Sequence, residues 1–280
     1  MSQSPIQDSI PAETTERIRF TDVHLGFGHG KSRVEVLDGV DFAVSSSEFV
    51  SVLGPSGCGK STLLNLAAGF LRPDSGLVEV DGEKVVGTDA RRGVVFQQYA
   101  IFPWLTVEEN IAFGLTLRAN RRRRAEIAET VARYIDLMGL TGFEKALPKT
   151  LSGGMRQRVA LARAYATDPD VMLLDEPFAA LDAQTREFMQ ELLHETSQQD
   201  RRAAMLITHS VEEAIFLSHR IVVLTNRPTR VHEVVEVDVG WPRTPESRTA
   251  PVFIELRKHL EQVMRSMSVR PSRTSRSSSA

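Results

Sequence analysis

The sequence has almost no cysteine and no long apolar run, and both absences exclude whole classes of protein. No window approaches the ~18 uncharged apolar residues of a transmembrane helix, which excludes an integral membrane protein. Cys58 is the single cysteine, so an internal disulfide is impossible and the chain fits a reducing compartment. The N-terminus lacks a basic start followed by an apolar stretch, so we expect no secretory signal.

A strong charge of either sign is missing as well. The chain has 34 lysines and arginines against 36 aspartates and glutamates, a net charge of −2. A nucleic-acid-binding domain would usually be clearly basic, so the composition argues against that partner. With 41% hydrophobic and 25% charged residues in 280, the composition is typical of a folded globular protein and excludes a wholly disordered one.

Both ends lack the apolar patterns of the interior. Residues 1–16 and 265–280 are polar, and the second segment carries four arginines, several serines and no acidic residue. We therefore expect disordered segments at both ends, the second of them a basic tail. The residues between them are predicted to form one domain over 17–250, followed by a helix over 251–264.

The interior alternates short apolar runs with helical patterns. Continuous apolar strands separated by helices favour an α/β fold with a mostly parallel sheet covered on both faces. Alternating patterns at 17–20 and 34–37 predict a further antiparallel β layer near the N-terminus. Helical composition from 106 to about 139 predicts an inserted helical subdomain, over about 98–166. The runs that predict buried strands are 49–53, 171–174, 205–208 and 221–224.

A glycine-rich sequence follows the first of these buried strands. Residues 54–61, GPSGCGKS, match G-x-x-x-x-G-K-[ST] and open a predicted helix. Glycines let backbone N–H groups turn toward an anion, and the helix N-terminus adds partial positive charge. Lys60 can reach β- and γ-phosphates, and the Ser61 hydroxyl can bind Mg²⁺. A chance match is expected in roughly one chain in a hundred, so the pattern predicts a phosphate site.

An acidic pair closes the predicted strand at 171–174. Asp175 and Glu176 would face the crevice where ligands bind in parallel sheets. Asp175 could hold Mg²⁺ directly or through water, and Glu176 could polarise an attacking water as a general base. The alternative for the pair is a solvated strand end. The upstream phosphate loop favours the functional interpretation.

A second helix start has a sequence that suggests anion binding. Residues 151–158 read LSGGMRQR, Ser152 is a plausible N-cap, and Met155, Val159 and Ala162 follow at helical spacing. The segment is either a capped helix alone or a second anion site without a lysine. The second interpretation suggests ATP shared between two chains.

Together, these motifs resemble those of the ATP-binding subunit of an ABC transporter, over residues 17–230. The family signature LSGGQ reads LSGGM at 151–155. The resemblance implies the ABC ATPase cassette, a P-loop NTPase core that hydrolyses ATP with Mg²⁺ to energise transport. It also implies a homodimer that sandwiches ATP, a separate membrane permease, an indirect exported solute-binding protein and no nucleic acid. The implied location is peripheral, on the cytoplasmic face of the inner membrane.

The resemblance assigns roles to individual residues. It makes Glu176 the catalytic carboxylate and His209 the switch histidine that senses the γ-phosphate. Gln97 would lie on Mg²⁺ and on the contact with the membrane partner, together with the metal residues Ser61 and Asp175. The implied nucleotide-binding residues are Phe27, Gly54, Pro55, Ser56, Gly57, Cys58, Gly59, Lys60, Ser61, Thr62, Gln97, Ser152, Gly153, Gly154, Met155 and Asp182.

Three positions depart from the family pattern. Met155 replaces the usual glutamine, as in some importer branches. Phe27 stands where an aromatic residue, usually tyrosine, stacks on adenine, and it supplies a ring face without a hydroxyl. Serines at 45–47 stand where a glycine turn usually precedes Glu48, which changes a β-turn and not the chemistry.

The segments around 94–114, 179–186 and 208–215 resemble the nitrate, sulfonate and taurine importer branch in particular. The aromatic stretch at 98–105 either packs onto its own helical insertion or offers an apolar patch to a partner. The arginine run from Arg121 to Arg124 begins a solvated helix face, or alternatively lies near anionic lipid head groups. Nitrate, taurine, alkanesulfonates and pyrimidine precursors of thiamine all remain open as cargo.

Two functions from other classes compete with transport. A soluble ABC protein acting on ribosomes or DNA would typically carry two cassettes or a long coiled-coil insertion, and neither pattern is present. A P-loop kinase for a small molecule would have no use for a second half-site at Ser152.

Overall fold

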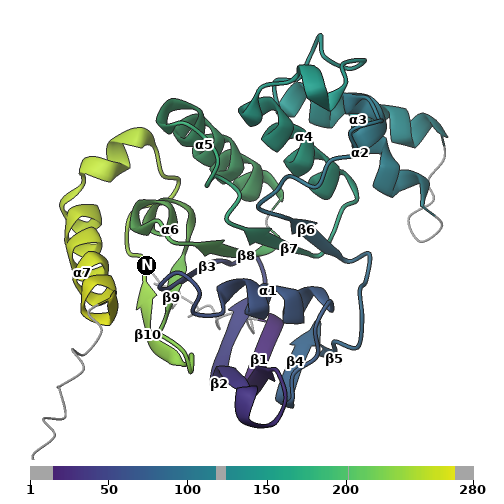
Figure 1. Ribbon diagram of the computed structural model, residues 1–280. Coiled ribbons are helices and arrows are strands. Elements are labelled where there is room, and N and C mark those ends of the chain that lie inside the picture. Colours follow the sequence, from purple (N-terminus) through teal and green to yellow (C-terminus); the bar gives the residue numbers. More distant parts are fainter. Residues whose placement is uncertain (1–14, 118–123, 201, 269–280) are drawn as a thin grey trace, which may run out of the picture.

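The structure, a computed structural model, describes residues 15–117, 124–200 and 202–268. Two sheets form its frame (Figure 1). The smaller sheet has the order β2-β1-β4-β5 and is antiparallel, as the alternating sequence at its start predicts. Phe20 and Phe42 face each other across β1 and β2, and their rings stack at 4.7 Å. Its strands are β1 (Glu16–Phe27), β2 (Val34–Ser45), β4 (Ser75–Val80) and β5 (Glu83–Lys84).

The larger sheet has six strands in the order β10-β9-β3-β8-β7-β6. All neighbours are parallel except β10, which returns antiparallel to β9. Every residue of β3 is buried, because both faces of the sheet are covered. The α/β prediction is confirmed. The strands are β3 (Phe49–Leu53), β6 (Arg92–Val95), β7 (Val171–Asp175), β8 (Ala203–Thr208), β9 (Arg220–Leu224) and β10 (Val231–Glu236).

Helices cover the larger sheet on both faces and divide the core in two. Helix α1 (Lys60–Ala68) packs in one core with the inner face of the smaller sheet. The opposite face packs against the other helices in the second core. Strand residues alternate between the two: Val50 and Val52 belong to the first, Phe49 and Leu53 to the second. The other helices are α2 (Val107–Thr116), α3 (Arg124–Leu137), α4 (Gly153–Ala166), α5 (Ala183–Asp200), α6 (Val211–Leu217) and α7 (Pro251–Ser268). Short 3-10 helices are η1 (Gly30–Ser32), η3 (Pro148–Thr150) and η4 (Pro245–Thr249).

Helices α2, α3 and α4 form a group between β6 and β7 in the chain, to the upper right in Figure 1. Buried Asn110 ties the aromatic stretch to this group, because its amide donates to the carbonyls of Phe102 and Leu105. The Phe102 ring lies 4.4 Å from that of Phe113 on α2. Trp104, in contrast, is 72% exposed. The stretch therefore packs partly on its own helices and partly faces outward.

Helix α7 continues to Ser268, four residues beyond the end predicted at 264. The reason is packing, since Val263, Met264 and Met267 pack against the second core at helical spacing. The rest of the predicted tail, 269–280, and residues 1–14 lie outside the described residues. Of the arginine run, the described residues include only Arg124, exposed at the start of α3. None of the described helices combines the length and apolarity needed to cross a bilayer.

A buried arginine lies where the chain enters β9 and leaves β10. The guanidinium of Arg243 donates to five backbone carbonyls, at distances from 2.6 to 3.3 Å. Its backbone N–H donates to Nε2 of buried His194 at 2.9 Å. The Trp241 ring lies 4.3 Å from the rings of both His194 and His219. The accepting carbonyls belong to Ile215, Phe216, Ser218, Val237 and Val239.

Candidate functional site

Three neighbouring strands bring the predicted site residues to one edge of the larger sheet. Leu53 of β3 is level with Thr208 of β8, and Ile207 of β8 is level with Asp175 of β7. The residues that follow these strand ends are therefore close together. They are the phosphate loop at 54–61, the acidic pair at 175–176 and His209.

The phosphate loop wraps its lysine and opens α1. Lys60 is buried, and its Nζ donates to the carbonyls of Gly54 at 2.8 Å and Pro55 at 3.0 Å. Gly59, the N-cap of α1, provides no side-chain cap, so the first backbone N–H groups of the helix stay available to an anion. Its φ is 121°, and a Cβ there would lie 2.8 Å from Val36 Cγ1. These features fit a triphosphate.

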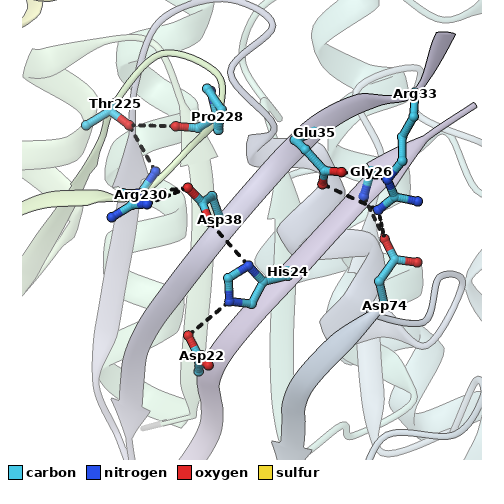
Figure 2. Close-up of polar contacts among 10 residues, drawn as sticks. All are labelled: Asp22, His24, Gly26, Arg33, Glu35, Asp38, Asp74, Thr225, Pro228 and Arg230. Atoms are coloured by element: carbon cyan, nitrogen blue, oxygen red, sulfur yellow. Dashed lines mark hydrogen bonds and ion pairs between the residues drawn. The ribbon is translucent and has the colours of Figure 1, made fainter. Parts of the chain in front are cut away.

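The loop is also tied to distant parts of the chain. The Thr229 hydroxyl donates to the carbonyl of Cys58 and is fully buried. Thr229 in turn exchanges backbone hydrogen bonds with β2, from its N–H to Val36 and from Asp38 to its carbonyl. Arg230 then pairs with the Asp38 carboxylate at 2.6 Å (Figure 2). The turn before β10 thus fixes the back of the phosphate loop.

Ser61 and Asp175 form the candidate metal site. The Ser61 hydroxyl donates to Asp175 Oδ1 at 3.0 Å. Burial raises the pKa of Asp175, and the neighbouring Glu176 adds to this effect. A half-buried carboxylate beside a hydroxyl is a donor pair that suits Mg²⁺, which takes few protein ligands and completes its shell with water and phosphate oxygens. The described residues contain no group of three or more histidine, cysteine, aspartate or glutamate side chains that could hold a metal ion.

Glu176 and His209 face each other across the ends of β7 and β8. Glu176 Oε2 lies 3.1 Å from Nδ1 of His209. The Glu176 backbone has φ 42°, in the left-handed region, and its N–H donates to Ile207 at 2.9 Å. The Glu176 side chain is 21% exposed and that of His209 57%. The carboxylate is therefore held in place while water can still reach it.

A buried carboxylate that no sequence pattern marks supports the loop of His209. Glu213 Oε2 accepts from the Thr208 hydroxyl at 2.6 Å, and that hydroxyl accepts from the Ser210 N–H at 3.0 Å. Arg186 approaches the other Glu213 oxygen at 4.0 Å and donates to the carbonyl of Leu181 at 2.8 Å. Burial raises the pKa of Glu213. In sequence, Glu213 resembles any acidic residue in the first turn of a helix.

Phe27 and Gln97 are both exposed, one at the end of β1 and the other shortly after β6. Phe27 is the last residue of β1, pairs with Val34 and is 46% exposed. Gln97 is exposed in a turn two residues after β6. Among the residues described, no hydrogen bond joins either of them to the phosphate loop.

The signature segment lies on the group of helices. Ser152 is the N-cap of α4 as predicted, and its Oγ accepts from the Met155 N–H at 3.2 Å. A Cβ on Gly153 would lie 3.8 Å from the hydroxyl of Tyr99. Asp182 accepts from the Thr185 N–H at 3.0 Å, and this hydrogen bond lowers the pKa of its carboxylate. Within the described chain, neither segment is hydrogen-bonded to the phosphate loop.

Comparison with known proteins decides the family. A family model described as ABC transporter matches residues 37–179. The chain belongs to the ABC transporter ATPases. It is 48% identical to an ABC transporter ATP-binding protein of Methanocaldococcus jannaschii over 240 residues, 85% of this chain and 88% of that protein. It is 42% identical to the aliphatic sulfonates import ATP-binding protein SsuB of Bacillus cereus over 245 residues, 88% of this chain and 94% of SsuB.

Solved structures agree with this assignment. The ABC ATPase chain resembles a dimeric ATP-binding cassette in a post-hydrolysis state, bound to ADP and Pi, with a TM-score of 0.70. The two are 31% identical, and the match covers 79% of this chain and 98% of the other. The chain is therefore an ATP-binding, ATP-hydrolysing subunit of a transporter.

Proposed function

We propose that this ABC ATPase energises the import of a small anionic solute, of the organosulfonate class, through a separate membrane permease. The observation that carries the proposal is the group of Lys60, Asp175, Glu176 and His209 at one sheet edge. The similarity to SsuB supports the sulfonate class over nitrate. The location that follows is peripheral, on the cytoplasmic face of the inner membrane.

Each residue of the group has a chemical task in this proposal. Lys60 and the free N–H groups at the start of α1 bind the phosphates. Ser61, Asp175 and Gln97 would hold Mg²⁺, which when bound neutralises charge on the phosphate oxygens. Glu176 accepts a proton from the attacking water. His209 lies next to Glu176 and would contact the γ-phosphate.

A second copy of the chain would complete each site. Ser152 and Asp182 lie on loops that make no hydrogen bond to the phosphate loop within the described chain. The start of α4 presents N–H groups, which suit a γ-phosphate from another copy. We infer a homodimer in which each ATP lies between one phosphate loop and the partner's signature segment.

The permease would dock beside Gln97. Exposed apolar side chains follow Gln97 in the chain, in the aromatic stretch and at the end of α2. Trp104 packs against Phe102, and Phe102 against Phe113, so a firm aromatic base supports the exposed ring. Residues of the patch are Trp104, Phe113 and Leu117.

Transport is tested by purification and reconstitution. Detergent-solubilised membranes should yield this chain together with a multi-span permease. Proteoliposomes that hold the pair should take up an alkanesulfonate or taurine when ATP is present, and Glu176→Gln should abolish uptake. Uptake of nitrate and not of either sulfonate would overturn the solute class, and the absence of any membrane partner would overturn the transport role.

The shared site is tested by mixing variants. Ser152→Arg should block dimer closure by bulk and charge, and Lys60→Ala should weaken nucleotide binding, so each purified variant loses ATPase activity. In a mixed dimer, one site combines both lesions and the other is intact, so mixing should restore a measurable fraction of the activity. Thr106→Arg removes a similar N-cap, on α2, and controls for the loss of a cap alone. Parent-level activity of Ser152→Arg without mixing would contradict the shared site.

A further inference from the structure

Beside Phe27, an aspartate accepts hydrogen bonds from two directions. Asp74 Oδ2 accepts from the Gly26 N–H at 2.8 Å and from the Arg33 guanidinium at 2.7 Å (Figure 2). Arg33 also contacts Glu35 at 2.5 Å. We call these four residues, Gly26, Arg33, Glu35 and Asp74, the Asp74 clamp. It joins the ends of β1 and β2 to the residue that precedes β4.

The clamp extends the pairing of β1 with β4 by a side-chain hydrogen bond. The β1–β4 ladder has its last pair at His24 and Ser75. Beyond it, the Asp74 N–H donates to the His24 carbonyl at 2.9 Å while its carboxylate takes the Gly26 N–H. One aspartate thus holds the chain on both sides of Leu25, directly before Phe27.

Gly26 lets the guanidinium lie against the backbone. A Cβ at this position would stand 2.8 Å from Arg33 Nη2 and 2.9 Å from Glu35 Oε2. The absence of a side chain is therefore what allows the clamp to close over the strand. The Gly26 and Arg33 hydrogen bonds lower the pKa of Asp74, so the carboxylate stays charged at neutral pH.

The end of β1 that the clamp fixes lies near the phosphate loop. Phe27 pairs with Val34, and Val36, two residues further on β2, packs against Gly59 of the loop. Phe27 also keeps a large part of its ring exposed, which leaves a face for a flat ligand. An exposed ring at the end of a strand can stack on a bound base only if the backbone that carries it is held in place.

We propose that Asp74 is a positioning residue, which fixes Phe27 through Gly26 and Arg33 so that the ring stacks on the nucleotide base. The inference rests on the proposed ATPase function and on the adenine-stacking role that the family resemblance implies for Phe27. Asp74 itself touches neither base nor phosphate. Loss of Asp74 should therefore weaken the binding of ligands that carry a base and leave unchanged the binding of ligands that carry phosphates alone.

This difference gives the experiment, with ATP and inorganic tripolyphosphate as the probes. Asp74→Ala should raise the KM for ATP about fivefold, and Phe27→Ala about tenfold, with kcat unchanged, because one base–ring contact is loosened or lost. The double variant should be no worse than Phe27→Ala, since both act on the same contact. The inhibition constant of tripolyphosphate should stay at the parent value in all three.

Asp41→Ala is the matched control. Asp41 also accepts from a guanidinium, Arg19 at 2.7 Å, and from a backbone N–H, that of Asp22 at 3.3 Å, on the same sheet. Its replacement should leave the KM for ATP unchanged. Arg33→Ala should raise that KM less than Asp74→Ala does, because the Gly26–Asp74 hydrogen bond persists.

The outcomes separate this inference from the proposed function. An equal loss of tripolyphosphate and ATP binding in Asp74→Ala would mean general damage to the loop and would overturn the positioning role. So would an unchanged KM in Asp74→Ala, or in Phe27→Ala, while the parent hydrolyses ATP normally. A parent chain that neither binds nor hydrolyses ATP would instead overturn the proposed function.

Discussion

The two ends of the larger sheet each carry a buried cation and a histidine, and they use them differently. At the carboxyl end, Lys60 donates to two carbonyls, which leaves the third ammonium proton for a ligand. At the amino end, the guanidinium of Arg243 donates hydrogen bonds to five carbonyls of the chain itself. His209 is exposed beside a carboxylate, whereas His194 is buried beside Arg243. The lysine at the binding end therefore keeps a donor for a ligand, whereas the arginine at the structural end donates to the chain itself.

The largest effect is expected from a substitution at the carboxyl end of the sheet, which should change ATP hydrolysis and leave stability unchanged. Glu176→Gln should lower steady-state ATP hydrolysis at least about a hundredfold, because the amide keeps the shape and cannot accept a proton from water. ATP binding and the free energy of unfolding should stay at parent values. Turnover above a few per cent of the parent rate would mean that Glu176 is not the base.

The next largest effect is expected from a substitution at the amino end of the sheet, which should lower stability and leave ATP hydrolysis unchanged. Arg243→Met should lower the free energy of unfolding by about 3 kcal/mol, because several buried carbonyls lose a charged donor. Urea denaturation measures the loss. Arg243→Lys, which reaches fewer carbonyls, should fall between Arg243→Met and the parent. ATPase activity per folded chain should be unchanged, and a proportional drop in kcat would contradict the division between the two ends.

A pH series separates the two histidines. Burial, Arg243 and His219 lower the pKa of His194 from 6.5 to about 4. The unfolded chain therefore binds more protons between these values, so stability is complete above pH 6.5 and is lost as pH falls toward 4. The loss between pH 7 and 5 should be about 2 kcal/mol.

The lowered pKa of His219 contributes in the same direction. His194→Gln keeps an acceptor for the Arg243 N–H and should remove much of this slope. His209→Gln, at the exposed end, should leave it in place. Equal slopes for the parent and His194→Gln, measured by urea denaturation at each pH, would refute the assignment.

The smallest expected effect concerns the support behind the carboxyl end. Glu213→Gln should lower kcat about fivefold with little change in KM, because the Thr208 hydroxyl that orders the His209 loop loses a charged acceptor. In a His209→Ala background the same substitution should cost little more. Glu212→Gln removes the next carboxylate, which is exposed and pairs with Arg257, and should leave kcat unchanged. A matching loss in both variants would mean a general effect on α6.

The sequence predicts the site residues at the strand ends well, but it does not predict the hydrogen-bonded residues that hold the surrounding loops in place. The phosphate loop and the pair at 175–176 follow continuous apolar runs, so their common edge could be inferred from the expected parallel direction of the strands. Asp74 and Gly26 are 48 residues apart, and Arg243 and His194 are 49 apart. Their partnership depends on tertiary packing, which no local pattern records. The end of α7 could not be predicted for the same reason. The polar segment there continues as a helix because Met264 and Met267 pack against the core.

The position of β3 in its sheet has a consequence for synthesis on the ribosome. β3 emerges early, yet its two neighbours are β8 and β9, which begin at 203 and 220. At about 5–20 residues per second, this apolar strand waits roughly 8–30 seconds for its first partner. The Thr229 hydroxyl that secures the phosphate loop arrives later still. A nascent chain therefore carries the nucleotide-binding motif long before it can hold a nucleotide, and its need for chaperones should be greatest in that interval.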